Sequence, residues 1–158
     1  MMEQPGNRED KIATDEWMPI YLKGIEMGQT VKLTPFGFSM YPLLVGGRDS
    51  LLLKKIDRKL KRGDICLYRR DNGIYVTHTV YKVDDKGTYF LGESQQNIEG
   101  PLRDDQILAL AEGFIRRGKE HSCDEKSYRF FHEIWLRLRP FRIRLIKIYR
   151  RVFRKPDK

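Results

Sequence analysis

Ser39 has surroundings that suit a nucleophile, because it lies within the short segment Gly37–Pro42 (GFSMYP). Glycine allows a sharp backbone turn and proline restricts the residue before it, so the segment can present a hydroxyl at the edge of a fold. A serine attacks a carbonyl only when a base accepts its proton and fixed donors stabilise the oxyanion. Taken alone, the segment would be interpreted as holding an ordinary turn serine.

His78 is the candidate base, in the strand-like segment Thr77–Val80 (THTV). An ordinary imidazole, with a pKa of about 6.5, is largely neutral at pH 7 and can accept a proton from a serine. A lysine in the same role would first need its pKa lowered by burial. Without Ser39, His78 would be interpreted as a buried strand histidine.

Several segments resemble, in order, the sequence boxes of type I signal peptidases and their relatives, a superfamily that includes LexA-type self-cleaving repressors. Residues 37–42 resemble the family's G-x-S-M-x-P motif, and Arg62–Ile65 (RGDI) resembles its G-D-[IV] strand start. Residues 77–80 are similar to the H-R-V box of the archaeal and reticulum enzymes. Leu91–Gln95 (LGESQ) resembles the later L-x-G-D-N box, and Ile107–Arg116 the closing strand. Together these boxes span residues 29–116.

The resemblance implies a serine endopeptidase that forms an acyl-enzyme on Ser39 with His78 as general base. A carboxylate would orient the imidazole, and the family's pattern points to Glu99 or to Glu93. Asp104 and Asp105 remain alternatives if the loop contains a gap.

Three features depart from the family's pattern: no membrane anchor is recognisable before the serine, Thr79 replaces Arg after the base, and the G-D-N box reads Gly92-Glu93-Ser94. In addition, Gly37 has no hydroxyl to donate. The oxyanion would therefore depend on backbone N–H groups, including that of Ser39. These departures keep a second interpretation open, a non-catalytic peptide-binding relative. A third, a LexA-like regulator, lacks a recognisable helix-turn-helix.

The fold class predicted is mainly β: a curled sheet or partial barrel of the signal-peptidase-like (LexA-like) type, with a short N-terminal helix and a C-terminal basic amphipathic helix. Short strand-like runs separated by turn residues support it. They are residues 29–35, 50–56, 64–70, 74–83, 88–91 and 107–116, with hairpins expected at Asn72-Gly73 and at residues 84–87. One helix is expected from Asp15 to a stop near Gly28.

The chain divides into a disordered lead-in (1–12), a peptidase domain (13–118), a linker (119–127) and a basic helical tail (128–158). Residues 1–127 carry 20 basic and 20 acidic side chains, whereas residues 128–158 carry 11 basic and 2 acidic ones. The whole net charge of +9 therefore belongs to the tail. Pro140 either kinks a single helix or starts a second one.

The tail is compatible with two structures. It could lie on an anionic membrane through residues 128–154, since aromatic and basic residues suit the headgroup region. Alternatively it packs on the domain and leaves a solvated basic face. Its predicted apolar face comprises Phe131, Ile134, Trp135, Leu138, Phe141, Leu145, Ile148, Tyr149 and Val152, opposite Arg129, Arg144, Lys147, Arg151 and Arg154. No nucleic-acid module accompanies the charge, so we expect no nucleic-acid partner.

The predicted chemistry needs no cofactor and no metal. Cys66 and Cys123 are far apart and lack ligand-spaced partners; we expect Cys66 in the core and Cys123 as a loop thiol. No secretory signal and no apolar stretch long enough to cross a membrane are recognisable. We therefore expect a cytoplasmic enzyme, in peripheral contact with the membrane if the tail binds lipid, whose substrate is the leader or signal peptide of a precursor.

Overall fold

The computed structural model describes residues 8–153, of which residues 8–14 and 153 are described by their backbone only. The protein is mainly β, as predicted, with one antiparallel sheet that does not close into a barrel, and three α-helices. The strands are β1 Val31–Leu33, β2 Ser50–Lys54, β3 Ile65–Arg69, β4 Tyr75–Asp84, β5 Gly87–Leu91, β6 Glu99–Leu102, β7 Ile107–Arg116 and β8 Lys119–Ser122. The helices are α1 Arg8–Glu26, α2 Lys126–Arg137 and α3 Arg142–Phe153, with short 3₁₀ turns η1 Asp104–Gln106 and η2 Arg139–Phe141.

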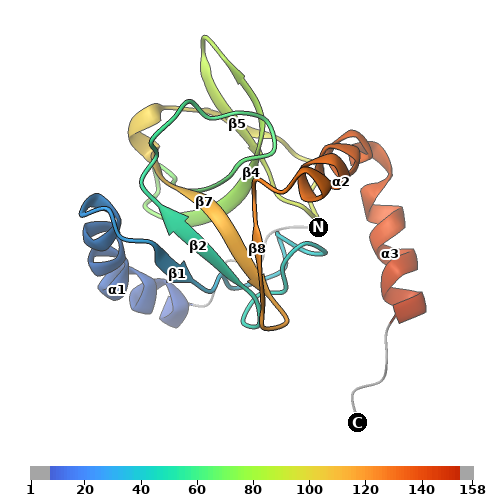
Figure 1. The fold of residues 1–158 in the computed structure, drawn as a ribbon, viewed down its shortest axis with the longest axis horizontal. Helices are drawn as coiled ribbons and strands as arrows, with labels where there is room; N and C mark the ends of the chain where they lie inside the picture. Colours follow the sequence, from blue (N-terminus) through green and yellow to red (C-terminus); the bar gives the residue numbers. More distant parts are fainter. Residues whose placement is uncertain (1–7, 154–158) are drawn as a thin grey trace.

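Strand β7 connects the two halves of the sheet, whose order is β1-β2-β7-β3-β4-β5-β6. The first part of β7 pairs with β3 and its second part with β2, while β8 pairs with its end. Figure 1 shows α1 at one end of this sheet and the α2–α3 pair at the other. The helical tail therefore lies beside β4 and β5, the strands that carry the candidate base and the segment of Glu93.

Both predicted hairpins are confirmed. β3 and β4 are joined around Gly73, whose φ of +85° is the left-handed conformation that glycine tolerates best. β4 and β5 are joined by a two-residue loop between Asp84 and Gly87. Turn residues specify these connections locally, so no distant contact was needed to predict them.

Two strands were not predicted, β6 and β8. β6 (EGPL) contains glycine and proline, and β8 (KEHS) is almost entirely polar. Both lie at edges of the sheet, where side chains face solvent and the apolar alternation of inner strands is absent. The predicted linker 119–127 is wrong as a consequence, because it contains β8 and the first two residues of α2.

Strand β3 lies between two hydrophobic cores. Its odd-numbered residues, Ile65 and Leu67, pack in a core with α1 and β2, and its even-numbered ones, Cys66 and Tyr68, pack in a second core with Phe90. Successive side chains of a strand point to opposite faces, so a strand buried on both sides has no polar alternation. Tyr68 and the residue paired across from Cys66, His78, therefore lie on the second face.

The N-terminal helix is longer than expected. It begins at Arg8 rather than near Asp15, so residues 8–12 of the predicted lead-in belong to α1, and residues 1–7 lie outside the described part. Its end agrees with the prediction, since Gly28 has a φ of +83° and its N–H donates to Ile25 O.

The basic tail forms two helices instead of one, with Pro140 in the 3₁₀ turn between them. The side that packs on the domain is only partly the predicted apolar face. Trp135 and Leu145 of that face are half-buried, but the buried residues are the polar His132 and Arg142 together with Leu136 and Ile146. Phe131 of the predicted apolar face is exposed instead. Periodicity alone could not show that buried polar contacts, rather than apolar ones, select the packed side.

Both cysteines are free and buried. Cys66 lies in the core as predicted, but Cys123 is not an open loop thiol, because it packs with the first core and its N–H donates to Glu112 O. Burial raises the pKa of both thiols, that of Cys123 to about 12. No described helix is long and apolar enough to cross a membrane.

Candidate functional site

The loop that carries Ser39 folds back on itself. Gly37 adopts a φ of +82°, and Gly46 approaches it so closely that a Cβ on Gly46 would lie 2.2 Å from Gly37 O. Met40 is buried in the first core and accepts a backbone hydrogen bond from Leu44. Ser39 itself is half-buried between this anchor and the exposed Phe38, so its position is set by its neighbours.

A buried aspartate closes the base of this loop. Asp49 accepts hydrogen bonds from Arg48, from Val45 N at 2.9 Å and from Arg117 N at 3.1 Å. Burial opposes ionisation of Asp49, but Arg48 and the two backbone N–H groups outweigh it and lower the pKa to about 2. The carboxylate is therefore charged at neutral pH and ties the Ser39 loop to the end of β7.

The main chain at Ser39 is held by the turn that follows β5. Ser94 N donates to Ser39 O at 3.0 Å, and Ser94 Oγ donates to Phe38 O at 2.8 Å. A Cβ on Gly92 would lie 3.0 Å from Ser39 O, so this position favours glycine. The box that resembles L-x-G-D-N thus contacts the Ser39 segment directly.

His78 lies buried on β4 in contact with Tyr68 and Glu99. Its Nδ1 is 3.0 Å from the Tyr68 hydroxyl and 4.0 Å from Glu99 Oε2, and the Tyr68 hydroxyl donates to Glu99 Oε2 at 2.7 Å. Arg70 binds the same carboxylate through Nε at 2.7 Å and through its Nη2 at 2.9 Å. Four side chains, from β3, the residue that follows it, β4 and β6, therefore form one polar network.

This network assigns the tautomer of His78. Burial opposes ionisation of Glu99, but Arg70 and Tyr68 outweigh it, so the pKa of Glu99 is lowered and the carboxylate accepts the Tyr68 proton. Burial and the neighbouring Glu99 raise the pKa of Tyr68, which keeps the phenol protonated. The phenol has one proton and donates it to Glu99, so its oxygen accepts from His78 Nδ1–H. In a neutral imidazole of this tautomer, Nε2 is the basic atom.

Glu93 lies on the other side of β4. It accepts a hydrogen bond from the hydroxyl of Thr79, the residue after His78, and lies 2.5 Å from Nε2 of His132 on α2. Because His78 and Thr79 point to opposite faces of the strand, the carboxylate that reaches Thr79 does not reach His78. Of the two sequence candidates, the structure places Glu99 beside the imidazole and Glu93 beside the tail.

Ser39 and His78 are held by adjacent parts of the sheet. Thr79 of β4 pairs with Leu91 of β5, and the two strands are antiparallel. His78, one residue before Thr79, therefore lies next to the start of the Gly92–Ser94 turn, which binds Ser39. Within residues 8–153, no hydrogen bond joins the Ser39 hydroxyl to His78. Catalytic hydrogen bonds are often long without substrate, so this geometry is compatible with a nucleophile and base that meet in the substrate complex.

The remaining acidic candidates lie at the surface. Asp104 and Asp105 are exposed in η1, and Asp105 forms an ion pair with Arg103 at 3.0 Å. They are not part of the His78 network.

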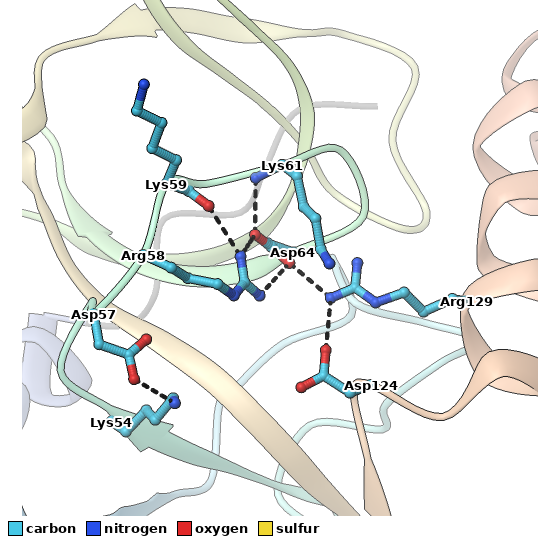
Figure 2. Close-up of polar contacts among 8 residues, drawn as sticks. All are labelled: Lys54, Asp57, Arg58, Lys59, Lys61, Asp64, Asp124 and Arg129. Atoms are coloured by element: carbon cyan, nitrogen blue, oxygen red, sulfur yellow. Dashed lines mark hydrogen bonds and ion pairs between the residues drawn. The ribbon is translucent and has the colours of Figure 1, made fainter.

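Asp64 of the RGDI segment is a buried junction of the fold. It accepts hydrogen bonds from Arg58, from Lys61 N and from Arg129 of α2, at 2.7, 2.9 and 2.9 Å (Figure 2). Burial opposes its ionisation, but Arg58 and the other donors outweigh it and lower the pKa of Asp64. The contacts indicate that Asp64 joins the start of β3 to the tail, outside the His78 network.

The sequence prediction missed Arg142, which is fully buried at the start of α3. Its guanidinium donates to Gly92 O at 2.9 Å, to Gln95 O at 3.1 Å and to Trp135 O at 3.1 Å. Trp135 Nε1 donates to Glu93 O at 3.1 Å. The two tail helices thus bind the Gly92–Gln95 turn, and Ser94 of this turn binds the main chain of Ser39. An arginine among many tail arginines carries no local signal for this role.

The described residues contain no group of three His, Cys, Asp or Glu side chains that could hold a metal ion. A surface groove of about 750 Å³ lies between the β4–β5 hairpin and residues 56–60; Asp104 lines it, whereas Ser39, His78, Glu93 and Glu99 do not. The Ser39 site is therefore identified by its contacts and not by a deep pocket.

No protein-family model matches this chain, and none of the curated proteins compared with it matches.

Proposed function

We propose that this protein is a serine endopeptidase similar to type I signal peptidases, which cleaves a leader or signal peptide. The observation that carries the proposal is the Tyr68–Glu99 pair at His78, because it leaves Nε2 of the imidazole as a base on the strand next to the turn that binds Ser39. The antiparallel, unclosed sheet is compatible with the signal-peptidase-like fold that the sequence boxes suggest.

The proposed mechanism uses only side chains of this chain. Ser39 Oγ attacks the scissile carbonyl and His78 Nε2 takes the hydroxyl proton. The imidazolium is stabilised through Tyr68 by the Glu99 carboxylate, and backbone N–H groups near Ser39 stabilise the oxyanion. His78 then returns the proton to the leaving amine as the peptide bond breaks. Water attacks the acyl-enzyme by the same steps, which releases the acid and restores Ser39.

The location that we propose is the cytoplasm. Cys66 and Cys123 are both free and buried, which suits a reducing compartment. Fractionation of cells that produce the protein, with a secreted marker alongside, tests this part of the proposal.

Labelling with a fluorophosphonate probe tests the peptidase. We expect one covalent adduct, located on Ser39 by mass spectrometry of the digested protein, and no adduct in Ser39→Ala. Ser127→Ala is the matched control, because Ser127 is exposed at the start of α2 and should leave labelling unchanged. Wild-type protein without an adduct on Ser39 would contradict the proposal.

Replacing Tyr68 by phenylalanine tests the tautomer argument. The ring remains to fill the second core, but His78 Nδ1 loses its acceptor, and Glu99 loses one donor while it keeps Arg70. The loss of a hydrogen bond to a charged group corresponds to roughly 1.5–3 kcal/mol, so we expect probe acylation to slow about 10- to 100-fold. Tyr89→Phe, at a half-buried hairpin position whose ring contacts Lys82, is the control and should acylate at the wild-type rate. Equal rates in both variants would exclude Tyr68 from the reaction.

A second candidate function is a non-catalytic peptide-binding module. The described structure favours it in one respect, since no hydrogen bond joins the Ser39 hydroxyl to the buried His78. Such a module would bind a leader peptide equally well as wild type and as Ser39→Ala, and would give no cleavage product by mass spectrometry. Labelling of Ser39 by the probe decides between the two functions.

A further inference from the structure

The outer face of α2 is apolar and aromatic. Phe130 and Phe131 are 65% and 68% exposed, and Ile134 follows one turn later, whereas His132 and Leu136 face the domain. Phe141, Ile148 and Val152 extend the exposed apolar surface along η2 and α3. Exposed large apolar side chains that gather on one element indicate a surface that contacts something other than water.

The outer face of α3 is basic. Arg144, Lys147 and Arg151 lie opposite the buried Arg142 and Ile146, at spacings of three and four residues that align them on one side of the helix. No ion pair to these three side chains is found among the described residues. The sequence has no acidic residue from 134 to 156 that could neutralise them.

We propose that the outer faces of α2 and α3 form a binding surface for an anionic phospholipid bilayer. Phenylalanine side chains enter the headgroup region readily, and each basic residue near anionic lipid adds to the attraction. The charge favours this occupant over a second copy of the chain, because a two-fold contact would bring two uncompensated basic faces together. The inner faces of the same helices pack on the domain through His132 and Arg142, so only the outer faces are open to a partner.

Helix α3 also contacts the loop of Ser39. The Arg150 guanidinium of α3 lies 5.8 Å from the ring centre of the exposed Phe38 and 5.0 Å from that of Tyr41. Bilayer binding through α2 and α3 would therefore bring the Ser39 loop close to the headgroups. The binding itself does not depend on the proposed peptidase activity, so Ser39→Ala should bind vesicles as the wild type does.

Cosedimentation of the full chain with lipid vesicles tests the proposal. We expect binding to phosphatidylcholine vesicles that contain phosphatidylglycerol, much weaker binding to phosphatidylcholine alone, and a decrease with added salt. The triple variant Arg144→Gln, Lys147→Gln, Arg151→Gln should bind anionic vesicles on the order of 100-fold more weakly, since each basic residue contributes about fivefold. These side chains are exposed, so circular dichroism should show a wild-type fold.

The apolar part has its own matched control. Phe130→Ser with Phe131→Ser should weaken vesicle binding at least about tenfold, because two large apolar side chains no longer leave water. Ile20→Ser with Met27→Ser removes side chains that are 71% and 70% exposed at the other end of the molecule, and should leave binding unchanged.

Three results would overturn the proposal. The first is a wild-type protein that does not sediment with anionic vesicles. The second is equal binding by the triple variant and the wild type. The third is a wild-type protein that binds no vesicles, is a dimer in sedimentation equilibrium, and becomes a monomer in the Phe130→Ser, Phe131→Ser variant. That result would assign the surface to a second copy of the chain.

Discussion

Replacing His78 by glutamine should slow acylation of Ser39 by about 10³-fold, within the range of 10² to 10⁴ that general-base catalysis contributes. Glutamine retains a similar volume and a hydrogen-bonding group for the Tyr68 hydroxyl, but it cannot accept a proton from a serine. The measurement is the second-order rate constant for fluorophosphonate labelling, followed by intact-protein mass spectrometry.

The control for this variant is His121→Gln. His121 lies on β8 and stacks on Phe114 at 5.1 Å, outside the network of Tyr68 and Glu99. It should label at the wild-type rate. If His78→Gln also labelled at that rate while Ser39 carried the adduct, another group would be the base and the proposed mechanism would be wrong.

Replacing Arg142 by methionine should lower the free energy of unfolding by about 3–5 kcal/mol, the usual cost of removing one partner of a buried charged contact. Methionine has a similar length and no charge, so the carbonyls of Gly92, Gln95 and Trp135 would lose their donor while remaining buried. Urea denaturation followed by tryptophan fluorescence measures the change, because Trp135 lies 5.4 Å from the guanidinium.

Arg144→Met is the matched control, because it lies two residues further on the same helix and is exposed. It should change the urea midpoint little. The Arg142 variant should also label more slowly at Ser39 under conditions where it remains folded, since Gly92 belongs to the turn that binds Ser39 O. A midpoint shift equal to that of Arg144→Met would show that the buried guanidinium does not stabilise the tail on the sheet.

The strands that the sequence predicted correctly are those with local signals. The turn at Gly73 and the one after Asp84 follow from residues adjacent in the chain, and the inner strands are rich in apolar residues. β6 and β8 lack both signals, because edge strands are stabilised by pairing with β5 and β7 and not by their own composition. Edge strands of this kind can be identified only from a structure that shows the strands with which they pair.

The packing of the tail also could not be predicted from local sequence signals. Helical periodicity and the basic charge were evident from the sequence, and the two alternatives, packing on the domain and contact with lipid, could not be separated. The structure shows that the inner side contacts Glu93, Asp64 and the backbone carbonyls of Gly92 and Gln95, which are all distant in sequence from the tail. The outer side is apolar and basic, so packing on the domain is confirmed for the inner side, and contact with lipid stays a proposal for the outer side.

The sequence by itself determined the identity and order of the candidate residues, because Ser39 and His78 each lie in a short segment whose residue types suit their chemistry. Only the tertiary structure decided which carboxylate lies beside His78. Glu93 and Glu99 are six positions apart in one stretch of chain, yet β4 presents His78 to one face and Thr79 to the other, and each face meets a different glutamate. The pairing depends on strand register across β3, β4, β5 and β6, which is set by long-range contacts and not by local residue types.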